Sequence, residues 1–213
     1  MAKYLVEFIG TFFLVLTIGC CILAPGDAGS LAPVAIGSVL MVMIFAGGHV
    51  SGGHYNPAVT LAVFLRGKCP AGDVIPYMIA QVVGAAVAAG IVLFLKSGGV
   101  DAPDVEPMKP VVIKALAAEF LFTFALVYVV LNVATAKATA GNSFYGLAIG
   151  FTVLAGAFSV GAISGGAFNP AVAVGITILG KSAVANIWIY LVANFAAAAA
   201  AAYWFKGINP TDK

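Results

Sequence analysis

The stretch Ser51-Gly52-Gly53-His54-Tyr55-Asn56-Pro57-Ala58-Val59 occurs twice in the chain, the second time as Ser164-Gly165-Gly166-Ala167-Phe168-Asn169-Pro170-Ala171-Val172. Seven of the nine positions are identical, at an offset of 113 residues. Ala35-Ile36-Gly37 recurs as Ala148-Ile149-Gly150 at the same offset. Agreement at separate places in the same order indicates an internal duplication.

Each copy of the motif predicts the start of a short helix. Proline is favoured at the first helical position, where its missing N–H costs nothing, and asparagine is a strong N-cap. The apolar segments Pro57–Phe64 and Pro170–Leu179 contain eight and ten residues, so they reach only about 12 to 15 Å as helices. We therefore expect two half-length helices, capped by Asn56 and Asn169.

The composition places the chain in a membrane. Of its 213 residues, 62% are hydrophobic and 8% are charged, and the mean hydropathy is +1.09. Soluble domains carry about 25% charged residues, so a soluble fold would expose a mostly apolar surface and aggregate. A net charge of +2 does not suggest an anionic partner such as nucleic acid.

Six apolar runs are long enough to cross a hydrocarbon core of about 30 Å as helices. They are 4–23, 31–46, 74–95, 111–134, 144–163 and 183–205. We predict a first repeat over about 1–96, a polar linker over 97–110 and a second repeat over about 111–213. Three spans per repeat is an odd number, so the repeats must enter the membrane from opposite sides. The expected fold is an all-α integral membrane protein with an inverted 3+3 repeat and two re-entrant half-helices.

Inverted topology brings both half-helix N-termini to the bilayer centre. Each N-terminus carries a positive partial charge of about half an elementary unit. Non-helical backbone at this depth is tolerated where it lines a wet cavity, and paired short segments in two halves indicate a transport site. The Asn56 and Asn169 amides would donate hydrogen bonds to a small permeant, in a field that opposes cations and protons.

The paired motifs resemble the signature of the aquaporins, the major intrinsic protein family. The residues that carry this resemblance are Asn56-Pro57-Ala58 and Asn169-Pro170-Ala171, and the likeness covers nearly the whole chain. It implies an hourglass pore in each subunit, a homotetramer, and passage of water or small neutral solutes.

Two acidic residues lie inside predicted spans, where charges are costly and usually functional. Glu7-Phe8 recurs as Glu119-Phe120 at an offset of 112. The resemblance implies that each carboxylate accepts hydrogen bonds from the backbone of a re-entrant loop; a proton relay is the alternative. We expect Gln81 and His54 to brace a loop too, with pH gating as the alternative for His54.

The chain departs from the family at the outer constriction, where most members place an arginine three residues after the second asparagine. That position is Val172 here. The other three constriction positions correspond by counting to Ile36, Ala157 and Gly166. The resulting set has no charge, aromatic ring or hydrogen-bonding side chain, which predicts a wide, weakly polar filter. The alternative is that Phe158 or Phe168 turns inward and fills the gap.

We therefore predict a passive channel for water and possible further neutral solutes, namely hydrogen peroxide, ammonia, urea and glycerol. No cofactor or metal site and no enzymatic activity is expected. The alternatives are a secondary transporter with broken helices and a non-conducting membrane structural protein. A weak excess of Lys and Arg on one side, six against four, predicts cytoplasmic termini. We expect a multi-pass protein of the plasma membrane.

Overall fold

The computed structural model describes residues 1–97 and 105–212. Within these residues six helices are long and apolar enough to cross a membrane, as the sequence predicts. They are α1 (Ala2–Ile22), α2 (Ala32–Ser51), α4 (Ala71–Lys96), α5 (Val112–Val130), α6 (Tyr145–Ser164) and α8 (Ile187–Ile208). Half of the predicted linker, residues 98–104, lies outside the described residues.

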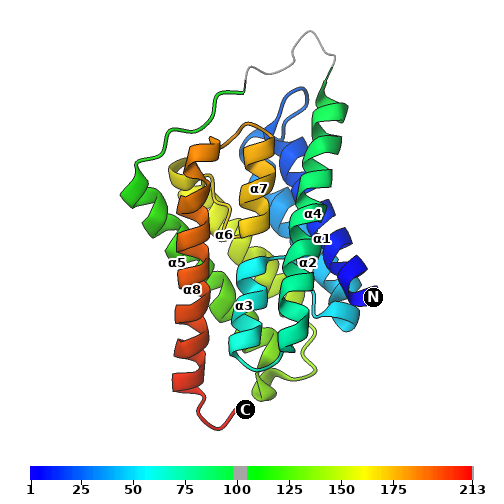
Figure 1. The fold of residues 1–213 in the computed structure, drawn as a ribbon, viewed down its shortest axis with the longest axis vertical. Coiled ribbons are helices and arrows are strands. Elements are labelled where there is room, and N and C mark those ends of the chain that lie inside the picture. Colours follow the sequence, from blue (N-terminus) through cyan, green and yellow to red (C-terminus); the bar gives the residue numbers. More distant parts are fainter. Residues whose placement is uncertain (98–104, 213) are drawn as a thin grey trace.

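Two short helices of nine residues each complete the architecture, α3 (Pro57–Leu65) and α7 (Pro170–Ile178). Figure 1 shows them in the middle of the molecule, α7 in the upper half and α3 in the lower half. We refer to the two ends of the molecule as the α7 side and the α3 side. Helix α3 packs against α8, and α7 packs against α4, so each half-helix contacts the last long helix of the other repeat.

The ends of α2 and α5 differ from the sequence-based expectation for reasons that the structure shows. Helix α2 continues to Ser51, five residues beyond its predicted end, because Gly47 gives the close approach that the Tyr55 side chain needs rather than breaking the helix. The predicted span 111–134 ends as a π-helical turn over Leu131–Thr135. There the Thr135 hydroxyl donates to the Leu131 carbonyl at 2.6 Å, a local bond that competes with the regular helical pattern.

A buried arginine ties the far end of α3 to the C-terminal segment. The Arg66 side chain is almost fully buried, and its Nη2 lies 2.7 Å from Asp212 Oδ1. The guanidinium also lies 4.8 Å from the Phe205 ring centroid. The Lys137 backbone N–H donates to Asp212 Oδ2 and, with Arg66, holds the pKa of that carboxyl below its ordinary value. Three segments thereby meet on the α3 side.

The two repeats touch most closely where α2 crosses α6. A Cβ atom added at Gly37 would lie 2.7 Å from the Gly150 carbonyl oxygen, and one added at Gly150 would overlap the Gly37 carbonyl. These two glycines belong to the repeated Ala-Ile-Gly triplets. The duplicated triplet therefore places glycine on both sides of the helix crossing, where backbone meets backbone.

Gly150→Ala is expected to lower the free energy of unfolding by about 1–3 kcal/mol, because backbone carbonyls cannot yield to an added methyl group as side chains can. Denaturant titration in detergent micelles measures the change. Gly90→Ala is the matched control: it lies in α4 with open space around its Cβ position. That control should be neutral or stabilising by about 0.5–1 kcal/mol, as alanine is the better helix former. Equal stability of both variants would contradict the close crossing.

Candidate pore

Asparagine caps both half-helices with the same geometry. Asn56 Oδ1 accepts from the backbone N–H of Ala58 at 2.8 Å and of Val59 at 3.5 Å. Asn169 Oδ1 accepts from Ala171 at 2.9 Å and from Val172 at 3.4 Å. Both side-chain oxygens are therefore engaged, which leaves each amide nitrogen to face the centre of the molecule.

Each asparagine nitrogen also links its repeat to the other one. Asn56 Nδ2 donates to the Phe168 carbonyl, and Asn169 Nδ2 donates to the Tyr55 carbonyl, both at 2.9 Å. Tyr55 and Phe168 each adopt φ = 49°, an uncommon left-handed backbone for residues other than glycine. An amide nitrogen carries two N–H donors, so one of them on each asparagine remains for a permeant.

The carboxylate of Glu7 is fully buried and holds the first re-entrant loop. Its two oxygens accept from the backbone N–H groups of His54 at 2.9 Å and Tyr55 at 2.7 Å. They also accept from the Ser51 hydroxyl and from Gln81 Nε2, each at 2.7 Å. The carboxylate therefore satisfies two backbone N–H groups of the loop and ties them to Ser51 and Gln81.

Glu119 repeats this arrangement in the second half. It accepts from the Ser164 hydroxyl at 2.7 Å, from the Ala167 N–H at 3.0 Å and from the Phe168 N–H at 2.7 Å. Asn194 occupies the place of Gln81. With its amide nitrogen turned toward the carboxylate, it donates to Glu119 Oε2 at 3.2 Å and accepts from the Asn169 N–H at 2.9 Å.

His54 presents a bare ring nitrogen to the interior. Its Nδ1 lies 3.1 Å from Thr60 Oγ1, whose single proton is donated to the Asn56 carbonyl and whose oxygen also accepts from Gln81. If the Thr60 proton stays on the Asn56 carbonyl, Nδ1 donates to Thr60 and Nε2 of the neutral ring is an acceptor. The His54 ring lines both the central cavity and a vestibule of about 420 Å³ on the α3 side.

A cavity runs past both asparagines. About 80 Å³ of it is open to the centres of water-sized molecules, which at about 10–15 Å³ each is room for five to eight waters. All four residues predicted for the filter line this cavity, and so do Asn56, Asn169 and His54. The filter residues are Ile36, Ala157, Gly166 and Val172. Apart from the asparagines, His54 and Tyr55, the side chains that line this cavity among the described residues are apolar.

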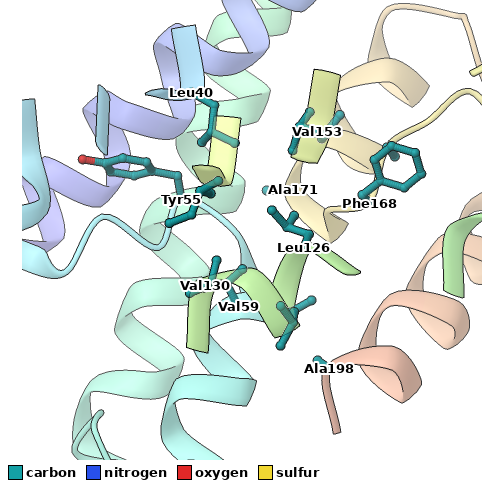
Figure 2. Close-up of a cluster of buried hydrophobic side chains, with 14 of the residues drawn as sticks. Leu40, Tyr55, Val59, Leu126, Val130, Val153, Phe168, Ala171 and Ala198 are labelled. Atoms are coloured by element: carbon teal, nitrogen blue, oxygen red, sulfur yellow. The ribbon is translucent and has the colours of Figure 1, made fainter. Parts of the chain in front are cut away.

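The two phenylalanines considered as inward-turned alternatives lie elsewhere. The Phe168 ring is 1% exposed and packs at 5.5 Å from the Phe122 ring, with its edge against Gly156. Figure 2 shows Tyr55 and Phe168 on opposite sides of the buried cluster, their rings directed away from each other. Phe158 is 54% exposed on the outer surface of α6. Neither ring contributes to the cavity wall formed by the described residues.

Comparison with known proteins agrees with this geometry. The family model described as "Major intrinsic protein" matches residues 1–205. Glycerol uptake facilitator protein-like 6 of Lactiplantibacillus plantarum is 37% identical over 218 residues, covering all of both chains. Aquaporin NIP1-4 of Oryza sativa subsp. japonica is 37% identical over 212 residues, covering 97% of this chain and 77% of the relative.

The chain belongs to the major intrinsic protein family. It is a channel protein of the aquaporin and aquaglyceroporin type, and not an enzyme. Its fold is also similar to that of the aquaglyceroporin from Plasmodium falciparum, with a TM-score of 0.81, 21% identity, and coverage of 96% of this chain and 94% of that one.

Sequence reasoning missed several polar residues that complete this family member's loops. Ser51, Ser164, Thr60 and Asn194 all bond to the carboxylates or their partners. The signal was present for three of them: both serines open the repeated motif, and Asn194 lies 113 residues after Gln81. Thr60 has no such signal, because its repeat counterpart is Ala173.

Glu119→Leu is expected to destabilise this channel severely. It would leave the N–H groups of Ala167 and Phe168 buried without an acceptor, at about 1–3 kcal/mol for each group. Glu119→Gln keeps one acceptor oxygen and should fall between Leu and wild type. The readout is the midpoint of thermal unfolding in detergent, with exposed Glu106→Gln as the control. A Glu119→Leu protein as stable as wild type would contradict the bracing role.

Proposed function

We propose that this protein is a passive channel for water and small neutral solutes. The observation that carries the proposal is the cavity that runs past Asn56 and Asn169 and is otherwise lined mostly by apolar side chains. A permeant at the centre receives hydrogen bonds from the free amide N–H groups. The two half-helix N-termini place positive partial charge around it, which opposes cations and protons.

The composition of the filter supports passage of neutral solutes larger than water, in addition to water itself. Ile36, Ala157, Gly166 and Val172 line the cavity without a charged or aromatic side chain, and neither Phe158 nor Phe168 lies in its wall. An arginine at position 172 would supply a donor fork and a fixed positive charge, and valine supplies neither. We include hydrogen peroxide, ammonia, urea and glycerol among the permeants. The 37% identity to a protein named as a glycerol uptake facilitator-like protein is consistent with this range.

A secondary transporter would need titratable groups free to bind an ion or proton near mid-membrane. Glu7 and Glu119 are the intramembrane carboxylates of the repeats, and both already accept several hydrogen bonds from loop groups. Their engagement favours a channel over ion-coupled transport.

We further propose a homotetramer in the plasma membrane with the α3 side facing the cytoplasm. Large apolar side chains such as Phe94, Ile113 and Val184 are exposed on the outer surface, where lipid or neighbouring subunits would cover them. The weak excess of Lys and Arg on the α3 side supports the orientation.

Stopped-flow light scattering on proteoliposomes tests the channel proposal. Water should cross with a low activation energy, a graded series of neutral solutes should follow by size, and no proton current should accompany them. Collapse of a pH gradient as fast as water equilibrates would overturn the proposal, and so would solute uptake against a gradient driven by an ion.

Val172→Arg is expected to narrow the pore and add a fixed positive charge. Urea and glycerol permeability should fall by about tenfold or more, equivalent to a barrier about 1.4 kcal/mol higher, while water permeability falls less. Solute-specific swelling of proteoliposomes measures both.

Val172→Glu is the control for this prediction, because it adds bulk with the opposite charge. If it excludes urea and glycerol to the same extent, bulk rather than positive charge sets the cutoff. A wild-type channel that already excludes both solutes would contradict the wide filter.

A further inference from the structure

The wall of the pore is duplicated along with the motif. Six of the seven aliphatic or glycine residues of the first repeat that line the cavity have counterparts from the second repeat in the same cavity, at offsets of 112 or 113. The pairs are Leu14 with Leu126, Ile18 with Val130, Ile36 with Ile149, Leu40 with Val153, Gly53 with Gly166, and Val59 with Val172. Each pair is identical or differs only between apolar side chains.

The geometry of the paired segments matches as closely as their chemistry. Gly53 and Gly166 both have φ = 63°. Val59 is 3% exposed and Val172 is 4% exposed, and each is the third residue of its half-helix. Ile36 and Ile149 are each the fifth residue of α2 and α6, whose closest approach at Gly37 and Gly150 is itself symmetrical. On the α3 side, Ile149, Gly53 and Val59 therefore occupy positions equivalent to those of the filter residues Ile36, Gly166 and Val172.

We infer that Ile149, Gly53 and Val59 form a second constriction, the α3-side ring, which selects solutes together with the α7-side ring of Ile36, Gly166 and Val172. This inference rests on the proposed channel function and adds a second specificity-determining site to it. An arginine on the α7 side would make that side the dominant barrier. With valine at both positions, the two rings present the same kind of barrier.

Each ring acts on a solute by the same physical means. Apolar side chains occupy part of the wall and cannot replace the hydrogen bonds that a solute gives up with its hydration shell. A solute such as glycerol meets this cost on both sides of the asparagine pair. Two barriers in a single-file path act as resistances in series, so the total resistance is their sum.

The duplication breaks at several cavity positions, and two of the differences lie beside the rings. His54 on the α3 side corresponds to Ala167, so that side carries an imidazole ring where the α7 side has a methyl group. Ala157 on the α7 side corresponds to Ile44, which is buried outside the cavity wall of the described residues. Neither difference changes the isoleucine and the valine of either ring. With a neutral His54, neither ring carries a charge.

Opening the rings singly and together tests the inference. Ile36→Ala and Ile149→Ala form a matched pair, and glycerol flux into proteoliposomes is the measurement. With equal barriers in series, either single variant raises glycerol permeability by at most about twofold, and the double variant raises it by more than the product of the two. If the α7-side ring alone is limiting, Ile36→Ala gives the whole increase, Ile149→Ala gives none, and the inference is overturned.

Narrowing the rings provides a second test. Unlike the Ile→Ala variants, these substitutions remove no side-chain volume from the protein. Val59→Leu and Val172→Leu add one methylene at equally buried sites. Both should reduce glycerol and urea flux while water flux changes less. Unchanged flux in Val59→Leu beside reduced flux in Val172→Leu would overturn the inference and leave the channel function intact. A wild-type protein that conducts neither water nor solutes would instead overturn the proposed function.

Discussion

Backbone polar groups at the centre of a membrane must find partners inside the protein, and two buried carboxylates meet this demand here. Glu7 accepts from the N–H groups of His54 and Tyr55, and Glu119 accepts from those of Ala167 and Phe168. Without these acceptors the loops would carry orphan donors where no water can solvate them. The positions of Asn56 and the rest of the pore wall follow from loops that are held in this way.

The repeats complete each other rather than folding as separate units. Asn56 donates to the Phe168 carbonyl and Asn169 to the Tyr55 carbonyl, so each motif satisfies a group of the other. The half-helices also pack against the last long helix of the opposite repeat. The left-handed backbone at Tyr55 and Phe168 costs free energy, and the hydrogen bonds to its N–H and carbonyl groups stabilise it. A pore with one motif removed would lose the caps, the crossed bonds and half of its wall.

The sequence was sufficient to predict the six spans, the two half-helices and their asparagine caps, because these depend on local chemistry and on a visible duplication. It was less informative for helix ends, ring directions and ion pairs that depend on tertiary contacts. The predicted run 31–46 stops before Gly47, yet Gly47 lies inside α2, where Tyr55 packs against it. Whether Phe168 turned inward could not be read from the sequence, because its ring direction depends on Phe122 and Gly156. The Arg66–Asp212 pair joins residues 146 positions apart and carries no motif.

The groups that hold the backbone are more strongly constrained to match between the two repeats than the side chains that line the cavity. The carboxylates, caps and glycines must stay matched, since each satisfies or avoids a fixed backbone group in its own half or the other. The cavity side chains are not constrained by backbone groups in this way. Even so, valine is present at both 59 and 172, whereas an arginine at 172 would make the two halves different. His54, opposite Ala167, is a polar side chain that distinguishes the two ends of the cavity. Thr60 Oγ1, 3.1 Å from Nδ1, holds this imidazole ring at the cavity wall. The chemical asymmetry of the pore thus lies beside the first motif, and the scaffold that holds it remains symmetrical.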